Sequence, residues 1–430
     1  MSLVKSPKDI VEEAEASGSA GLLSRHDSWG RVEIGNVATI QNGAPFPSTS
    51  FNTNRSGFPI IRIRDVGKNE ISTWFDGEYS DDFIVRHGDL LIGMDGDFRS
   101  SRWLGEPALL NQRVCRLIVS DSRIGQAFIE FALPAYLDAI ADETSSITVK
   151  HLSSKSIQQI PLPLPPLAEQ ERIVEILEEQ FSRLDSALAS VKAVREKSKA
   201  FRRSLLHSAF NGELTGGTDG WREVALKDLA EGGNFFDGDW VESKDQDPNG
   251  TVRLVQLSDV GEGNFRHKSD RWLREDQAEG LGVSYLVAGD LLIARMPDPM
   301  GRSCRVPVLP TQSITAVDVA VLRIRRSDVN PDFTMWQINS PLARSIIVGL
   351  ASGTTRQRIS RKNLGQVTLF LPPLSEQERI VEILEEQFSK LDKALEVANQ
   401  LEARIASERR SLLHAAFTGE LTSQWRKTHV

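Results

Sequence analysis

Basic side chains able to contact DNA recur at corresponding places in the two halves of the sequence. Arg99 and Arg102 follow the run GDLLI at 88–92, and further arginines follow the same run at 289–293. Arginine pairs bidentately with guanine edges, whereas lysine, threonine and backbone amides hold phosphates. A single such residue is more simply a solvated loop charge. Clusters at paired positions favour contact with nucleic acid.

Similar clusters lie on two strand-like runs and just before two long helical stretches. The strand-like runs are IRIRDV at 61–66 and RLVQLSDV at 253–260, and the segment TTRQRISRK at 354–362 leads into the second helical stretch. The complete set of DNA-binding candidates is Arg62, Arg64, Arg99, Arg102, Lys150, Lys155, Arg253, Gln256, Arg295, Arg302, Arg305, Thr355, Arg356 and Arg358.

Residues for catalysis or metal binding do not assemble into a recognisable set. The sequence has no GxxxxGK[ST] phosphate loop, no GxGxxG after a strand, no GxSxG and no HExxH. His207 and His414 occupy equivalent helical positions, where packing or an interface is the simpler role. The DGD runs at 95–97 and 237–239 are typical of turns. We therefore expect no catalytic residue and no metal site in this chain.

The elements that must position the basic clusters include a stretch that occurs twice. Residues 167–215 begin LAEQERIVEILEEQFSRLD and end RRSLLHSAFNGELT, and residues 374–422 begin LSEQERIVEILEEQFSKLD and end RRSLLHAAFTGELT. The offset is 207 residues (374 − 167) throughout, without a gap. Between these ends, 189–201 and 396–408 share no identical aligned residue but keep the same length. The pattern indicates a fixed length in the middle and a fixed surface at the ends.

Each repeat has the sequence signals of one long helix. Pro-Pro pairs at 165–166 and 372–373 precede the repeats, Gly212 and Gly419 end them, and neither Gly nor Pro interrupts them. Apolar residues alternate in steps of three and four, which indicates a coiled-coil seam, and about 43 residues give a rod of roughly 65 Å. The predicted seam comprises Val174, Leu177, Phe181, Leu184, Leu188 and Val191, then Val381, Leu384, Phe388, Leu391, Leu395, Leu401, Ile405 and Leu412.

One amphipathic helix alone is more often part of a core, but the simplest partner for a duplicated seam is its own copy. An antiparallel pair places the acidic start of each helix beside the Arg-Arg close of the other, whereas a parallel pair places glutamate beside glutamate. We therefore expect an antiparallel pair with a pseudo-two-fold axis and two like ends, suited to two copies of one partner. The partner-facing candidates, which are identical between the repeats, are Gln170, Ile173, Ile176, Leu206, Phe210, Gln377, Ile380, Ile383, Leu413 and Phe417.

The rest of the sequence forms two globular segments with a shared frame and divergent loops. The run GDLLI is common to both, whereas the stretches 42–57 and 232–250 differ in sequence and in length. Such a pattern is expected of two recognition modules with different targets. The predicted division is a mobile lead-in at 1–28, a recognition domain at 29–166, a spacer helix at 167–215, a second recognition domain at 216–373, a second spacer helix at 374–422 and a tail at 423–430.

Composition limits the classes of function. The 430 residues are 40% hydrophobic, no apolar run approaches the ~20 residues that span a bilayer, and the start lacks the apolar core of a signal peptide. We therefore expect a cytoplasmic protein.

Cys115 and Cys304 are the only cysteines, so neither a disulfide framework nor a CxxC metal site is available. The net charge of −8 argues against an independent DNA binder, unless a partner supplies part of the positive surface.

The order of globule, EQERIVEILEEQF helix after Pro-Pro-Leu, and closing LLHxAFxGELT resembles the specificity subunit of type I restriction–modification systems, from Trp29 to Trp425. The resemblance implies an α+β fold with two target recognition domains, each reading one half of a bipartite double-stranded DNA site from the major groove. It implies an antiparallel helical spacer that sets the gap, two methyltransferase subunits bound at the helical ends, and restriction subunits joining through the complex. S-adenosylmethionine, ATP and Mg are then expected on those partner subunits, and no cofactor is expected in this chain.

Two other functions remain open from the residues. A stand-alone DNA-modifying enzyme needs an NPPF-like or metal-binding set, which the sequence does not show. A duplicated coiled-coil scaffold without a nucleic-acid role accounts for the helices but leaves the paired basic clusters unexplained. A non-catalytic DNA-binding subunit is therefore the preferred hypothesis.

Overall fold

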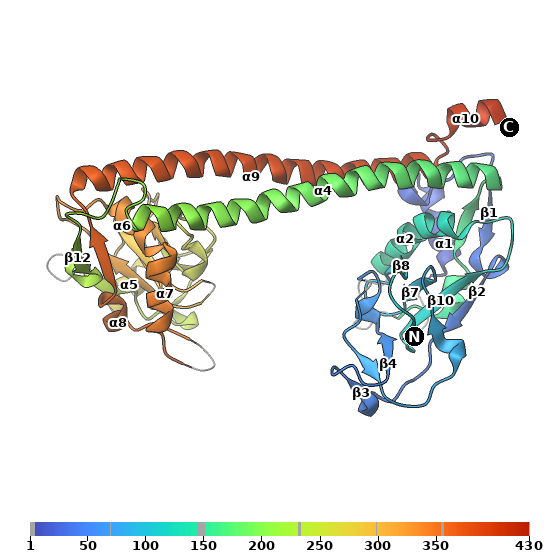
Figure 1. Cartoon of the computed structure of the whole chain (residues 1–430), viewed down its shortest axis with the longest axis horizontal. Coiled ribbons are helices and arrows are strands. Elements are labelled where there is room, and N and C mark those ends of the chain that lie inside the picture. The colour runs from blue at the N-terminus through green and yellow to red at the C-terminus, as the bar shows by residue number, and fades with distance from the viewer. Residues whose placement is uncertain are drawn as a thin grey trace. The chain divides into compact units, whose positions relative to one another are not determined.

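The computed structural model describes residues 5–68, 70–143, 151–230, 234–297, 299–353 and 357–429. Its contacts group into two compact units, of which unit 1 comprises residues 1–190 and 401–430 and unit 2 comprises residues 191–400. Each unit contains one sheet-rich domain together with part of both long helices (Figure 1). The two sheet-rich domains and the mixed helix and strand content confirm the predicted α+β class.

The helices are α1 (Pro7–Ala16), α2 (Gln126–Glu143), α3 (Ser154–Gln158) and α4 (Leu167–Phe210), then α5 (Glu275–Leu281), α6 (Pro331–Ile338), α7 (Pro341–Gly349), α8 (Arg361–Gly365), α9 (Leu374–Phe417) and α10 (Ser423–His429). Helices α4 and α9 are the two predicted spacer helices. The remaining helices belong to the globular parts or to the two chain ends.

The strands of unit 1, together with α2 and α3, make up domain 1. They are β1 (Gly30–Glu33), β2 (Ala38–Asn42), β3 (Phe51–Asn52), β4 (Phe58–Ile61), β5 (Trp74–Phe75), β6 (Ile84–Val85), β7 (Leu90–Gly93), β8 (Ser100–Arg102), β9 (Ala108–Leu110), β10 (Val114–Val119) and β11 (Pro161–Leu164).

The strands of unit 2, together with α5 to α8, make up domain 2. They are β12 (Arg222–Ala225), β13 (Phe235–Asp237), β14 (Val252–Val255), β15 (Trp272–Leu273), β16 (Leu291–Ala294), β17 (Ser303–Arg305), β18 (Ser313–Thr315), β19 (Val319–Leu322) and β20 (Thr368–Leu371).

The two domains share one sheet topology. An antiparallel four-stranded sheet has the order β2-β10-β7-β8 in domain 1 and β13-β19-β16-β17 in domain 2. A parallel pair recurs in a second sheet, as β4 with β9 and as β14 with β18. The first strand of each domain pairs with the strand that leads into a long helix, β1 with β11 and β12 with β20. The repeat seen in the sequence is therefore a repeat of the fold.

The run GDLLI builds the central strand of each four-stranded sheet. Its glycine has a φ of 96° in both copies, a conformation that favours glycine. The aspartate that follows pairs with an arginine on or just after the neighbouring strand, Asp89 with Arg116 at 2.9 Å and Asp290 with Arg323 at 2.7 Å. The apolar residues form β7 and β16, in which every residue is buried.

The strand-like run at 61–66 leaves β4 after its first residue, because the aspartate near its end caps a 3₁₀ turn. Asp65 is buried and accepts a hydrogen bond from the backbone N–H of Arg62 at 2.9 Å. Asp259 does the same for the backbone N–H of Gln256 at 2.8 Å. The shared Asp-Val pair of the two runs thus marks a rigid turn.

The two long helices begin where the sequence predicts and end at Phe210 and Phe417, just before Gly212 and Gly419 and five residues short of the predicted bounds at 215 and 422. Helices α4 and α9 have 44 residues each, and Figure 1 shows both as unbroken ribbons. Gly212 and Gly419 follow them with φ of 85° and 76°, the left-handed conformation in which helices commonly end.

The long helices pack antiparallel. In unit 2, Arg195 donates a hydrogen bond to Asn399 at 2.7 Å, and Arg202 pairs with Asp392 at 3.0 Å. The position on α9 therefore moves back by seven residues as the position on α4 advances by seven. The predicted antiparallel arrangement is confirmed.

In each unit an arginine of one long helix lies over a phenylalanine ring of the other. Arg202 lies over the ring of Phe388, 4.2 Å from its centroid, and Arg409, the repeat equivalent of Arg202, lies 4.9 Å from the ring centroid of Phe181. Arg409 also pairs with Asp185. The expected attraction between the acidic first part of one helix and the Arg-Arg pair near the end of the other is present, and a cation–π contact adds to it.

The seam follows the predicted spacing with one exception. Its buried members include Leu177, Val191, Leu384, Phe388 and Ile405. Leu401 was expected in the seam but is 42% exposed, whereas Ala398 is 6% exposed. The prediction for Leu401 is wrong because the seam moves three residues from Leu395 to Ala398 and then seven residues, one further step of four and one of three, to Ile405.

A buried carboxylate joins the start of α4 to two other segments. Glu169 is fully buried, and its carboxylate accepts hydrogen bonds from the indole N–H of Trp29 at 3.1 Å and the hydroxyl of Thr422 at 2.7 Å. Arg426 forms an ion pair with the same carboxylate. Because Trp29 precedes β1 and Thr422 follows α9, one side chain ties together domain 1, α4 and the tail.

Unit 2 repeats this junction with a continuous chain. Glu376, at the start of α9, accepts hydrogen bonds from the indole N–H of Trp221 at 3.0 Å and from the hydroxyl of Thr215. Residues 215–221 run directly from the end of α4 to β12. In unit 1 the two ends of the chain, brought together at Glu169, take the place of that linker.

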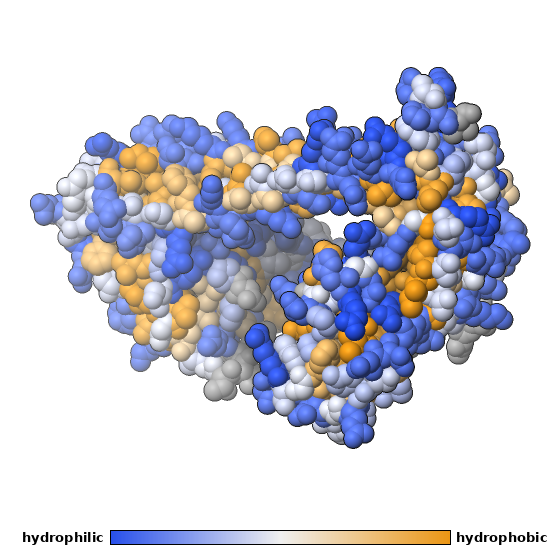
Figure 2. All heavy atoms as spheres, turned by 45° about the vertical axis from the view of Figure 1, so that its right-hand side comes forward, coloured by the Kyte–Doolittle hydropathy of each residue, from blue (hydrophilic) through white to orange (hydrophobic). Residues whose placement is uncertain are grey.

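Helix α1 packs on domain 1, which corrects the prediction of a mobile lead-in for the described part of that segment. Val11 of α1 is 2% exposed and belongs to the core of domain 1, and Glu15 pairs with Arg31 at 2.6 Å. The tail forms α10, whose surface is mainly hydrophilic (Figure 2). The lead-in is ordered because its apolar face has a core to join.

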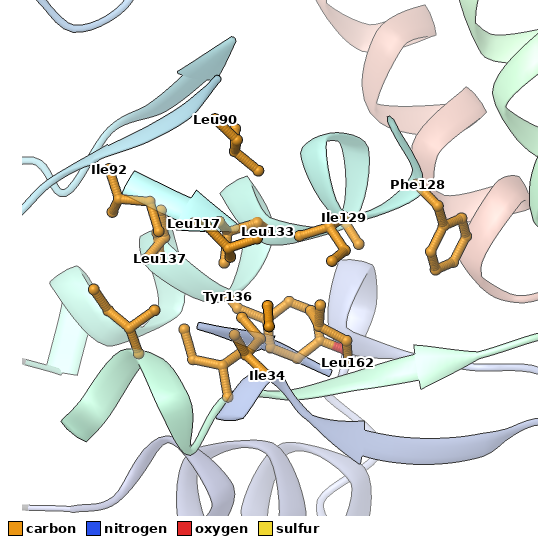
Figure 3. Close-up of a cluster of buried hydrophobic side chains, with 14 of the residues drawn as sticks. Ile34, Leu90, Ile92, Leu117, Phe128, Ile129, Leu133, Tyr136, Leu137 and Leu162 are labelled. Carbon is orange, nitrogen blue, oxygen red and sulfur yellow. The ribbon is translucent and has the colours of Figure 1, made fainter. Parts of the chain in front are cut away.

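Each domain has a separate hydrophobic core on either face of its central strand. Leu90 and Ile92 of β7 belong to a helix-side core that includes residues of α4 and α9, whereas Leu91 belongs to an outer core. Figure 3 shows Leu133 and Tyr136 of α2 gathered in the helix-side core. Strand β16 divides domain 2 in the same way. Alternating side chains thus separate the face that grips the helices from the face that points away from them.

Replacing Arg426 by alanine tests the junction at Glu169. Loss of the cation leaves a buried carboxylate with fewer partners, at a cost of about 3 kcal/mol. Hydrogen exchange should rise in peptides covering 26–31, 167–175 and 419–425. Lys427→Ala removes an exposed cation from the same helix and serves as the matched control, with exchange unchanged. Equal exchange in both variants would contradict the role given to Arg426.

Candidate nucleic-acid interface

Domain 1 has an open cleft of about 440 Å³ beside its outer core. The 3₁₀ turn after β4 and the loop after β7 form it, and Arg62 stands at the start of that turn. Arg64, Lys68 and Arg99 supply its cations, with the Arg64 side chain 54% exposed and the Arg99 side chain 67% exposed. Such side chains can reach acceptor groups on phosphates or base edges.

The loop after β7 is held in one shape by a buried ring. Phe98 has a φ of 46°, which is strained for a residue other than glycine, and it is 1% exposed. Asp95, at the start of the loop, pairs with Arg113 and lies 2.7 Å from the imidazole of His151. The loop therefore presents Arg99 at the rim of the cleft from a fixed backbone.

Domain 2 has a cleft of about 560 Å³ with a different lining. Gln256 and Arg358 are the predicted candidates that line it, together with Met296. Trp240 stands at the cleft with 68% of its surface exposed. Burial raises the pKa of Asp239 above its usual range, although its carboxylate accepts a backbone hydrogen bond.

The two clefts lie near the same part of the shared frame but are lined by different segments. The loop after the central strand contributes to both, through Asp95 and its equivalent Met296. The domain 1 cleft is otherwise lined by the turn after β4, whereas the domain 2 cleft is lined mainly by the loop after β13 and the link between β18 and β19. In domain 1 the turn after β4 packs on the outer core through Val66, whereas Phe98 of the loop after β7 packs into the helix-side core. Both the segments that line the clefts and the chemistry of the lining differ between the domains.

Three predicted DNA contacts are buried, which contradicts their assignment. Arg253, Arg295 and Arg302 are 8%, 6% and 5% exposed. Arg302 donates hydrogen bonds to two backbone carbonyls of the turn after β14, at 2.7 and 2.8 Å, and Arg253 pairs with the buried Asp259 at 3.0 Å. Burial lowers the pKa of Arg295. These arginines hold the walls of the cleft and do not face a ligand.

Other candidates lie outside the clefts, and two of them pair with carboxylates, as Arg99 at the cleft does with Asp97 at 3.1 Å. Arg102 pairs with Glu130 at 2.6 Å, and Arg305 pairs with Asp332 at 2.7 Å. Lys155 is exposed on α3. Lys150, Thr355 and Arg356 lie outside the described residues.

Most partner-facing candidates are also buried within the chain, so that expectation is corrected. The amide of Gln170 donates to the backbone carbonyls of Arg123 and Pro165, both at 2.8 Å, and accepts from the N–H of Gly125 at 2.9 Å. Gln377 clamps the equivalent loop of unit 2. The buried candidates are Gln170, Ile173, Leu206, Phe210, Gln377, Ile380 and Phe417, and the half-buried ones are Ile176, Ile383 and Leu413. Each helix end packs against its own domain as well as against the other helix, and this second buried face was not predicted.

Charged and polar side chains remain at the helix ends as the repeated exposed surface. They are Glu171 and Glu378, Glu175 and Glu382, Glu179 and Glu386, Arg203 and Arg410, and His207 and His414. They are identical between the repeats and exposed in both units.

Sequence reasoning missed Lys68, Asp239 and Trp240 among the residues that line the clefts. Trp240 lies in the divergent stretch 232–250, and an aromatic residue in such a polar loop is a signal that could have found it. The inward direction of the buried arginines had no such signal, because the carbonyls that bind them come from distant segments.

Within the described residues, no three or more His, Cys, Asp or Glu side chains are grouped as a metal site requires. The search of those same residues for a helix long and apolar enough to cross a membrane finds none.

Comparison with known proteins identifies the family. A model of the type I restriction modification DNA specificity domain matches residues 26–190 and 218–406. The type I restriction enzyme EcoBI specificity subunit of Escherichia coli is 33% identical over 446 residues, which cover 99% of this chain and 92% of the relative. The EcoKI specificity subunit of Escherichia coli strain K12 is 28% identical, over 95% of this chain and 92% of the relative.

A solved structure has the same fold. It comes from work on complex assembly and conformational transition of the type I restriction–modification system, and it aligns with a TM-score of 0.67 and 19% identity over 92% of this chain and 99% of that chain. The two matched ranges of the family model each contain one sheet-rich domain and the first part of the long helix that follows it. This chain therefore belongs to the family of type I restriction–modification specificity subunits, the non-catalytic components that recognise DNA sequence.

Proposed function

We propose that this chain reads a bipartite double-stranded DNA site, with each domain reading one half from the major groove. The observation that carries the proposal is that each domain of a duplicated frame has an open cleft near the end of its central strand, with its own lining. Domain 1 offers Arg64, Lys68 and Arg99 there, whereas domain 2 offers Gln256 and Trp240. Two different half-sites require two different sets of side chains, because base edges are distinguished by their donors and acceptors.

The α4–α9 pair is proposed to set the gap between the two half-sites. Each helix has 44 residues, and at ~1.5 Å per residue it measures roughly 66 Å. The antiparallel contacts within each unit support a stiff pair. The middle segments 189–201 and 396–408 keep their length while every aligned residue differs, as expected where length matters more than side-chain identity.

Two methyltransferase subunits are proposed to bind the repeated exposed surface of the helix ends. In unit 1 this surface includes Glu175 and Glu179 of α4 with Arg410 and His414 of α9. The equivalent residues of unit 2 offer the same charges, so one kind of partner fits both. Restriction subunits are proposed to join through the assembled complex.

Cofactors are proposed to belong to the partners. S-adenosylmethionine fits the methyltransferase subunits, and ATP with Mg fits the restriction subunits, because the sequence of this chain has no phosphate loop and no NPPF-like motif. The complex is proposed to act in the cytoplasm, where the DNA of the cell lies.

Sequencing of methylated DNA from cells that carry this chain with its methyltransferase tests the proposal. A split motif with a constant gap is expected. Replacing residues 29–166 by the corresponding domain of a relative should change one half of the motif and leave the other half intact. A change in both halves contradicts independent domains. Methylation without any partner subunit would support a stand-alone enzyme instead, and no methylation with the partner present would support a scaffold.

Lengthening both helices tests the spacer. Seven residues inserted after Val191 and seven after Ala398 keep the seam in phase but add roughly 10 Å, about three base pairs of DNA and about 100° of helical rotation. Methylation at the original gap should be lost, and a changed gap or no methylation should be observed by the same sequencing.

The matched control for this insertion is an exchange of 189–201 with 396–408 between the two helices. It alters the sequence of both middles but preserves their length and their pairing partners. The gap should stay as it is. An unaltered gap after the insertion, or a changed gap after the exchange, would rule out helix length as the determinant.

A pair of arginine variants separates DNA contact from structural support. Arg99→Ala removes an exposed cation at the cleft of domain 1, so DNA binding by the complex should weaken without a change in unfolding temperature. Arg302→Ala strands two backbone carbonyls and should lower the stability of domain 2 by about 3 kcal/mol. Thermal unfolding and salt-dependent DNA binding measure both effects. Normal stability of Arg302→Ala together with weak DNA binding would overturn its structural assignment.

A further inference from the structure

One position differs in identity between the domains although its backbone is held in the same way. Arg62 and Gln256 are equivalent residues, each directly before the 3₁₀ turn. Their backbone N–H groups donate to the buried carboxylates of Asp65 at 2.9 Å and Asp259 at 2.8 Å. Both backbones are extended, with φ of −97° and −119° and ψ of 162° and 176°. The same rigid base therefore carries two different side chains.

Gln256 lies in a cleft, and Arg62 lies next in sequence to two residues that line one. Gln256 lines the cleft of domain 2 and is half-buried. Arg62 directly precedes Ile63 and Arg64, which line the cleft of domain 1, and its guanidinium lies 5.9 Å from the ring centroid of Phe51. A partly exposed polar side chain on a fixed backbone, at the edge of an open cleft, has the support that precise recognition needs.

Arginine and glutamine read different bases. Arginine donates two N–H groups to the O6 and N7 atoms of guanine, whereas glutamine accepts from N6 and donates to N7 of adenine. We propose that this position determines base specificity in each domain, with Arg62 reading a guanine in the half-site of domain 1 and Gln256 reading an adenine in the half-site of domain 2. The inference rests on the proposed function, in which each domain reads one half of the site.

The surroundings of Gln256 fit a base edge better than a bare polar surface would. Arg302 donates hydrogen bonds to the carbonyls of Leu257 and Val260, so the turn is fixed from its inner side as well. Trp240 offers an exposed apolar face in the same cleft, against which a thymine methyl group or a deoxyribose can pack. Both features favour one orientation of the DNA at Gln256.

A reciprocal exchange of the two side chains tests the proposal in the complete complex with its methyltransferase. Gln256→Arg should convert one adenine of one half-site to guanine, and Arg62→Gln should convert one guanine of the other half-site to adenine. Discrimination at each position should be roughly 5- to 150-fold, the value of one good bidentate contact. Gln312→Arg is the matched control, since it makes the same change at an exposed position of domain 2 that does not line the cleft, and its motif should equal that of the unaltered chain.

The outcomes separate this inference from the proposed function. Efficient methylation of an unchanged motif by both exchange variants overturns the inference, and so does a half-site for domain 2 without an A·T pair. Where a variant abolishes methylation, its complex is tested on duplexes that carry each base at each motif position. Loss of discrimination at one position supports the inference, and equal weakening at every position overturns it. The absence of any bipartite motif with the unaltered chain contradicts the proposed function itself.

Discussion

One carboxylate at the start of each long helix, fully buried at Glu169 and half-buried at Glu376, constrains the rest of the fold. A carboxylate removed from water is costly unless donors surround it, so Glu169, and to a lesser degree Glu376, fixes the position of the groups that reach it. Each receives the indole of the tryptophan that opens its domain and the hydroxyl of the threonine that follows the opposite helix. A shift of the domain along its helix would remove the hydrogen-bond donors of this carboxylate. The start of a domain, the start of its helix and the end of the other helix are thereby set in one register.

The two faces of the central strand have different roles in each domain. Its alternate residues pack into two cores, one of which grips the long helices while the other supports the cleft. The helix-side face must fit the same repeated helices in both units, so its contacts recur. The cleft-side face has no such constraint, and its lining can change from Arg64 and Lys68 in one domain to Gln256 and Trp240 in the other. Constant assembly and variable recognition therefore use opposite faces of one strand.

The long helices were predictable because their signals are local. Prolines before them, glycines after them and a regular apolar spacing determine both ends and the seam, and charge determines the antiparallel direction. The predicted seam is wrong at Leu401. That prediction chose a larger residue that does not fit the spacing over Ala398, which does. Side-chain size is therefore a poorer guide than period in a long coiled coil.

The site was predictable only in outline. Repetition of GDLLI and of the Asp-Val runs indicated a shared frame, but it did not show which loops line each cleft, and in domain 2 these are mainly the loop after β13 and the link between β18 and β19. The fate of single arginines was not predictable, since Arg253 and Arg302 turn inward to a carboxylate and to carbonyls that only the fold provides. For the same reason Gln170 and Gln377, identical between the repeats, proved to be internal clamps instead of partner contacts. Identity between repeats reveals a shared role but does not tell an inner face from an outer one.

A structure of the complex on its cognate duplex tests the central claim most directly. The account predicts that base edges of one half-site lie at the cleft lined by Arg64 and Arg99, within reach of Arg62, and that those of the other half-site lie in the cleft at Gln256. DNA seated on another face of either domain, with both clefts empty of base edges, would contradict it.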